Sequence, residues 1–234
     1  MPRPELLLAL DVPDADAALA LVRRFAGRCR FYKVGLELFT AEGPAIVRAV
    51  QASGADVFLD LKLHDIPHTV RAAARRAAGL GVRLLTVHAS GGAAMVAAAV
   101  EGAGAGCGIL GVTVLTSLTG AEVGAAWGRP PVDPGTEVLR LSGVAAAAGA
   151  HGVVCSGQEL AAVTAAFGGR LAPLVPGLRP AGVAADDQAR VVTPEGAAAA
   201  GARYLILGRA VTAASAPEAA WDGIAGAVAG ALGG

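Results

Sequence analysis

The stretch DLKLHDIPHT at residues 60–69 directly follows the apolar run Val57-Phe58-Leu59, which predicts a buried strand. Side chains alternate between the two faces of a strand, so Asp60 and Lys62 are expected to point the same way. Pro67 suits the first turn of a following helix. Charges at the end of a buried strand are costly to desolvate unless they are paired, so this cluster predicts a functional site. A structural salt bridge is the alternative.

Outward from this stretch, short apolar runs alternate with Ala-rich stretches of helical pattern. Near-continuous Val, Leu and Ile runs are typical of strands buried on both faces of a parallel sheet. We expect strands at residues 6–11, 30–35, 56–62, 83–88, 108–115, 152–155, 171–176 and 203–207. We expect helices at residues 14–25, 44–52, 69–78, 93–100, 137–148, 158–167, 193–200 and 217–232.

Eight strands and eight helices in alternation predict an α/β protein with a closed (β/α)8 TIM barrel. No composition break suggests a second domain, so residues 1–234 are expected to form a single domain. An open doubly wound sheet is the alternative, but the first turn, Asp11-Val12-Pro13-Asp14, lacks the glycine-rich dinucleotide fingerprint. The Pro/Gly-rich residues 127–136 predict a surface loop after the fifth strand.

Composition narrows the function classes. The 19 basic and 19 acidic residues balance, which argues against nucleic-acid binding. The scattered Cys29, Cys107 and Cys155 fit a reducing cytoplasm better than a disulfide framework or a zinc site. Residues 102–121 carry no charge, but their six glycines and the lack of basic flanks favour a central strand with its loops over a membrane span.

Active sites of such barrels lie at the C-terminal ends of the strands, so the residues at those ends are informative. Polar groups there are predicted to converge on one mouth. They are Asp11, Lys33, Asp60, Lys62, His88, Thr116, Ser117, Arg179 and Arg209.

The last two of these loops predict a phosphate site. Gly177 and Gly208 let the backbone approach an anion, and Gly208 opens a short helix whose N–H groups attract phosphate. Arg179 or Arg209 could add a bidentate contact. The alternative is two surface arginines beside ordinary glycine caps.

Lys33 and Lys62 could alternate with Asp60 and Asp65 in an ionised array. At about 4 Å, each pair is worth roughly 4 kcal/mol at an effective dielectric of 20. A protonated Lys62 suits a proton donor better than a Schiff-base nucleophile. Metal binding by the two aspartates stays open, although Lys62 already supplies a countercharge. His64, His68 and His88 are expected to have no catalytic role.

These residues resemble the orotidine 5′-phosphate decarboxylase family in its single-domain bacterial form. The D-x-K-x-x-D element alone is shared with a wider set of sugar-phosphate lyases, and its continuation through residues 66–69 is more specific. The resemblance runs over nearly the whole chain. The matching motifs are Leu10-Asp11, Lys33-Val34-Gly35, residues 60–69, Val87-His88-Ala89, Leu115-Thr116-Ser117, PGLR at 176–179, DDQARVVTP at 186–194 and GRAVT at 208–212.

The resemblance implies a cofactor-free decarboxylation of orotidine 5′-monophosphate to UMP, the last step of de novo pyrimidine synthesis, with no metal. Lys62 would protonate carbon 6, and Asp60 would face the substrate carboxylate. The remaining implied contacts are Asp11 and Lys33 with the ribose, Thr116 and Ser117 with the pyrimidine, and Arg179, Gln188, Gly208 and Arg209 with the phosphate, beneath a closing lid at 180–190. Asp65 and Thr69 would reach the partner's site in a homodimer.

Two rivals remain open. A magnesium-dependent lyase, such as a keto-gulonate phosphate decarboxylase or a hexulose phosphate synthase, would use the same Asp/Lys cluster with a metal bound to its carboxylates. A non-catalytic nucleotide-binding protein would keep only the phosphate contacts, although the intact Asp60, Lys62 and Asp65 set speaks against it.

Overall fold

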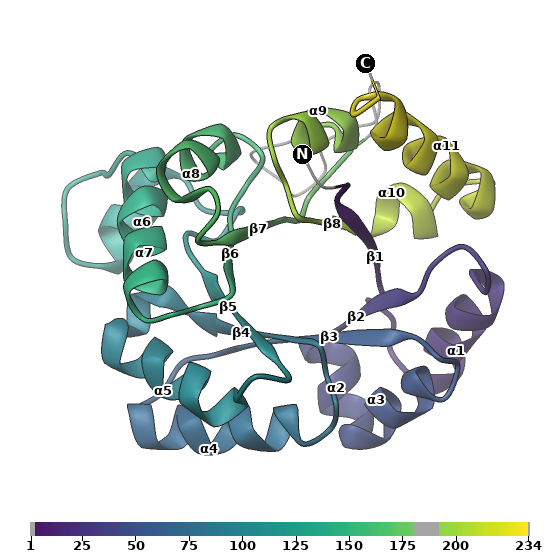
Figure 1. Ribbon diagram of the computed structural model, residues 1–234, viewed down its shortest axis with the longest axis horizontal. Helices are drawn as coiled ribbons and strands as arrows, with labels where there is room; N and C mark the ends of the chain where they lie inside the picture. The colour runs from purple at the N-terminus through teal and green to yellow at the C-terminus, as the bar shows by residue number, and fades with distance from the viewer. Residues whose placement is uncertain (1–2, 180–191, 234) are drawn as a thin grey trace.

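The computed structural model describes residues 3–179 and 192–233. Eight parallel strands pair in sequence order and close into a barrel, and Figure 1 shows this ring with the helices outside it. The predicted TIM barrel is therefore confirmed. The strands are β1 Glu5–Ala9, β2 Phe31–Gly35, β3 Asp56–Leu63, β4 Leu84–His88, β5 Gly108–Val112, β6 Gly152–Val154, β7 Ala172–Val175 and β8 Tyr204–Leu207.

All eight predicted helices are present, with ends displaced by a few residues. They are α1 Ala15–Arg24, α3 Pro44–Gln51, α4 Pro67–Ala78, α5 Ala93–Ala103, α7 Pro134–Ala147, α8 Leu160–Phe167, α9 Pro194–Ala199 and α11 Pro217–Gly230. The short helix expected after Gly208 is α10, Arg209–Thr212, and a 3-10 turn, η1, spans Ala89–Gly91. Among the described helices, none is long and apolar enough to cross a bilayer.

Two helices were not predicted. Helix α2, Leu36–Glu42, follows β2 without an intervening loop, and α6, Gly120–Ala126, follows β5. Helix α6 begins with a capping box in which the Thr119 hydroxyl accepts from the Glu122 amide and the Glu122 carboxylate accepts from the Thr119 amide. This T-x-x-E signal was readable in the sequence.

The loop predicted at residues 127–136 is shorter than expected. Helix α7 begins at Pro134, because Asp133 caps it by accepting from the Thr136 amide at 2.7 Å. Proline at the first helical position has no amide that needs a partner. The irregular segment therefore ends at Asp133.

Apolar side chains fill the barrel interior below its C-terminal mouth. They come from inward-facing positions such as Phe31 on β2, Phe58 on β3 and Leu84 on β4. A second apolar layer packs between the outer strand faces and the helices. Because strand side chains alternate, the next inward positions along β2 and β3 belong to Lys33 and Asp60. The apolar filling thus ends where the charged groups begin.

An ion-pair cluster lies at the opposite, N-terminal mouth. The Arg83 guanidinium donates to both Glu5 carboxylate oxygens, at 2.6 and 2.7 Å, and to Asp56 at 2.9 Å. Beside this cluster, a ring nitrogen of His151 lies 2.9 Å from the Tyr204 hydroxyl oxygen. Burial, with the nearby Arg203 and Arg83 charges, holds the pKa of His151 below its usual 6.5.

We predict that His151→Gln makes the free energy of unfolding depend less on pH on the acid side. The folded state disfavours protonated His151, so the unfolded chain binds more protons once the pH falls through 6.5. Wild-type stability should be full above that pH and decline below it, by at most about 1.4 kcal/mol per pH unit for this group. Urea unfolding between about pH 7.5 and about pH 5 measures the effect. Parallel profiles for variant and wild type would contradict the prediction.

Candidate active site

Strand β3 brings Asp60 and Lys62 together, but not through a regular strand. Its pairing with β4 shifts register between Leu59 and Leu63. Lys62 has φ of 50°, and it is the only non-glycine residue with positive φ in the described part of the chain. Such a conformation is strained for a lysine and often marks a functional site. The two side chains still meet, with the Lys62 ammonium donating to Asp60 Oδ2 at 2.7 Å.

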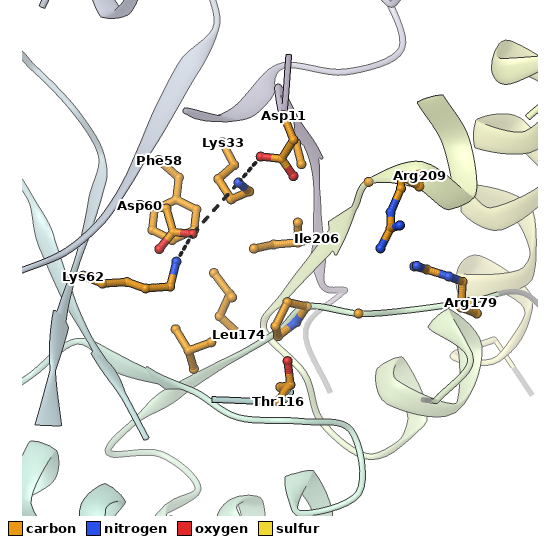
Figure 2. A pocket seen from close by; sticks show the side chains of 15 residues that line it. Asp11, Lys33, Phe58, Asp60, Lys62, Thr116, Leu174, Arg179, Ile206 and Arg209 are labelled. Carbon is orange, nitrogen blue, oxygen red and sulfur yellow. Dashed lines mark hydrogen bonds and ion pairs between the residues drawn. The ribbon is translucent and has the colours of Figure 1, made fainter. Parts of the chain in front are cut away.

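Four charged groups of alternating sign run across the mouth from β1 to β3. The Lys33 ammonium lies 2.6 Å from Asp11 Oδ1 and 3.9 Å from Asp60 Oδ2, and Asp60 in turn binds Lys62. Figure 2 shows this chain of contacts. Lys33 and Asp60 are only 8% and 9% exposed. Alternation places an opposite charge beside each buried one, which offsets the cost of desolvation.

Gly35 leaves the space that the Lys33 ammonium occupies. A Cβ at position 35 would lie 2.9 Å from Lys33 Nζ and 3.3 Å from Asp11 Oδ1. Its backbone, with φ of −93°, is open to any residue. Glycine is therefore required here for room rather than for conformational freedom.

Two arginines lie at the other side of the same mouth. Arg179, on the segment after β7, is buried, and its Nη1 donates to the Leu178 carbonyl at 3.0 Å. Arg209 begins α10 after β8. Figure 2 shows the two guanidinium groups pointing toward one another. Facing cations favour an anion between them, and planar guanidinium groups match phosphate oxygens.

The four charged groups and the two arginines line one cavity of about 340 Å³. Its floor is apolar and includes Phe58, Leu174 and Ile206. These were not among the predicted site residues, although inward alternation along their strands would have found them. The predicted residues that line the cavity are Asp11, Lys33, Asp60, Lys62, Thr116, Gly177, Arg179, Gly208 and Arg209.

Other predicted residues lie elsewhere. Asp65, Thr69 and Ser117 are exposed and do not line the cavity. The Asp65 carboxylate accepts from the adjacent Ile66 amide at 2.6 Å, so the expected four-membered array of Lys33, Lys62, Asp60 and Asp65 does not form within one chain. Asp11 takes the fourth place instead. Gln188 and the lid predicted at 180–190 lie outside the described residues.

The histidines stay out of the cavity. His88 packs against His64, with ring centroids 5.3 Å apart. Burial, with the nearby His64 and Lys62 charges, lowers the pKa of His88 below its usual value. Within the described residues there is also no group of three or more His, Cys, Asp or Glu side chains placed to hold a metal ion.

A closed parallel barrel with lysine–carboxylate pairs and two arginines at its C-terminal mouth defines a (β/α)8-barrel enzyme. Comparison with known proteins gives the particular family. The family described as Orotidine 5'-phosphate decarboxylase / HUMPS matches residues 4–224, and the chain belongs to it.

Individual relatives agree with this assignment. An orotidine 5'-phosphate decarboxylase from Anaeromyxobacter sp. (strain K) is 53% identical over 224 residues, covering 96% of this chain and 98% of the relative. One from Halorhodospira halophila is 49% identical, covering 97% and 96%. The crystal structure of orotidine 5'-phosphate decarboxylase from Lactobacillus acidophilus matches with a TM-score of 0.82 at 32% identity, covering 97% of this chain and 99% of that one.

We predict that Gly35→Ala keeps the fold and separates Lys33 from Asp11. The added methyl displaces only the flexible end of Lys33, so the free energy of unfolding should stay within about 1 kcal/mol of wild type. In a crystal structure of the variant, the Lys33 ammonium should lie beyond hydrogen-bonding distance of Asp11 Oδ1, against 2.6 Å in the wild type. Gly223→Ala on α11 is the matched control, because a Cβ there meets nothing within 4 Å. An unchanged distance in Gly35→Ala would contradict the prediction.

Proposed function

We propose that this chain decarboxylates orotidine 5′-monophosphate to UMP and carbon dioxide without a cofactor, the last step of de novo pyrimidine synthesis. One observation carries the proposal. The Lys62 ammonium is held by Asp60 in a cavity whose other side presents two arginines. The names of the relatives support the same reaction. A cavity of about 340 Å³ falls within the usual size range for small ligands.

Lys62 is the proposed proton donor. As the bond between carbon 6 and the carboxylate breaks, the electron pair stays on carbon 6 and carbon dioxide leaves. Lys62 Nζ then delivers a proton to carbon 6, giving UMP, and the amine regains a proton from solvent. An ammonium already in place stabilises the developing negative charge without reorganising.

Asp60 has two proposed roles. Its Oδ2 holds the Lys62 amine at 2.7 Å. It would also face the substrate carboxylate, and repulsion between the two carboxylates is relieved when carbon dioxide departs. The cavity floor includes the apolar side chains of Phe58 and Ile206, which lower the local dielectric and so strengthen both effects.

The remaining assignments follow the cavity from one side to the other. Asp11 and Lys33 would bind the ribose hydroxyls, and Thr116, with Ser117 beside it, the pyrimidine edge. Remote phosphate binding supplies energy that is used at carbon 6. The proposed phosphate ligands are Arg179, Arg209, Gly208 and Gln188, the last of which lies outside the described residues.

The proposed active form is a homodimer in which Asp65 and Thr69 complete the partner's site. All residues from 64 to 69 are exposed, and Ile66 is 65% exposed. Leu115 and Trp127 are further exposed apolar side chains on the chain. A large apolar side chain within a run of exposed residues fits a protein contact. A cytoplasmic location is part of the proposal and fits three free, buried cysteines.

We predict that the purified protein consumes orotidine 5′-phosphate in an ultraviolet assay, equally well with and without EDTA. Lys62→Ala should lower kcat by at least about 10³-fold, because the proton donor is lost, while UMP still binds by calorimetry. Loss of wild-type turnover on chelation, restored by magnesium, would favour the metal-dependent lyase. Binding of UMP with no wild-type turnover would favour a non-catalytic nucleotide-binding protein.

We also predict that a heterodimer of Asp65→Ala and Lys62→Ala chains is active. Co-expression with two different tags isolates it, and one of its two sites then holds both Lys62 and Asp65. It should show about half of the wild-type activity per dimer, whereas each variant homodimer is inactive. An inactive heterodimer would mean that each site is built from one chain.

A further inference from the structure

Thr86 lies directly behind the charged cluster and outside the cavity lining. It occupies the middle of β4, two residues after the inward-facing Leu84, and it is fully buried. It was not among the predicted site residues. A buried hydroxyl needs hydrogen-bond partners, and those of Thr86 are both on β3.

The two hydrogen bonds of Thr86 have a defined direction. The Lys62 backbone amide can only donate, so Thr86 Oγ1 accepts from it at 2.9 Å. The hydroxyl proton is then directed to Asp60 Oδ1, which lies 2.8 Å away. The second carboxylate oxygen, Oδ2, accepts from the Lys62 ammonium. One oxygen of the Asp60 carboxylate therefore accepts from the buried Thr86 hydroxyl, and the other accepts from the Lys62 ammonium.

These bonds lie at the break in register between β3 and β4. Leu59 pairs with Leu85 and Leu63 pairs with Val87, so three residues of β3 face the one residue Thr86. Such a bulge leaves backbone groups without their usual ladder partners. The Thr86 hydroxyl supplies one partner, for the amide of the residue whose φ is positive.

We propose that Thr86 is a positioning residue for the proton transfer from Lys62, an inference that rests on the proposed function. Through one hydroxyl it holds the strained backbone of Lys62 and the orientation of the Asp60 carboxylate. It does not line the cavity, so its removal should act on catalysis through the placement of Nζ. Without it, the Lys62 amide and Asp60 Oδ1 lose a buried partner, and relaxation of either group moves the amine.

The test compares Thr86→Val, which keeps the shape and loses the hydroxyl, with Thr86→Ser, which keeps the hydroxyl. Thr86→Val should lower kcat on orotidine 5′-phosphate by on the order of tenfold to a hundredfold, with KM and the UMP dissociation constant within about twofold of wild type. Thr86→Ser should recover kcat to within about threefold.

Thr113→Val is the matched control. Thr113, the residue after β5, is also a buried threonine that does not line the cavity, but its hydroxyl donates to the Val154 carbonyl at 2.7 Å. Its kcat should stay at the wild-type value. A loss equal to that of Thr86→Val would mean that any buried hydroxyl matters alike, which overturns a positioning role.

Three results at Thr86 would also overturn the proposal: a kcat for Thr86→Val within twofold of wild type, an equal loss in Thr86→Ser, or a parallel rise in KM and in the UMP dissociation constant. If Thr86→Val does not fold, Thr86→Ala takes its place under the same criteria. If the wild type does not turn over orotidine 5′-phosphate, the proposed function fails. The crystal structure of the variant then decides the role of Thr86, which is refuted if Lys62 keeps its positive φ and its 2.7 Å contact with Asp60.

Discussion

The contact between the Lys62 ammonium and the Asp60 carboxylate is the interaction on which the arrangement of this site depends. Neither group would be stable at the edge of an apolar barrel interior without the other, because a desolvated charge is costly. The flanking groups extend the same logic. Lys33 and Asp11 continue the alternation of charge, and Gly35 leaves room for it by lacking a side chain. The site is thus one connected electrostatic unit drawn from the first three strands.

The barrel determines where this unit can lie. Parallel strands buried on both faces need apolar inward positions along most of their length, and Phe31, Phe58 and Leu84 supply them. Two residues further on, the inward positions reach the mouth, where solvent and neighbouring charges reduce the cost of polar side chains. The same argument places Arg179 and Arg209 after β7 and β8. Charged groups therefore lie at the two mouths of the barrel, with those of the site at the C-terminal mouth, and leave the barrel centre apolar.

Much of this could be predicted from the sequence, because the relevant signals are local. Apolar runs predicted all eight strands, and the residues at the strand ends and in the last two loops predicted nine of the cavity residues. The register break in β3 could not be predicted in this way, because alternation assumes an unbroken ladder. Thr86 was missed for the same reason: its partners lie on a neighbouring strand, and only the break brings them within reach. Helix α6 is different, because its capping box of Thr119 and Glu122 is a local signal that the sequence itself contains.

The break in β3 also bears on which chemistry the D-x-K-x-x-D element performs here. A carboxylate that holds a hard cation needs oxygens open to it. Asp60 has one oxygen on the Lys62 amine and the other on the Thr86 hydroxyl, and Asp65 lies outside the cavity of its own chain. The positive charge beside Asp60 is therefore an ammonium, and unlike a metal ion an ammonium carries a proton that it can donate. A cluster built in this way suits proton donation by the ammonium itself to the carbon that a departing carboxylate leaves, which supports metal-free decarboxylation over metal-assisted lyase chemistry.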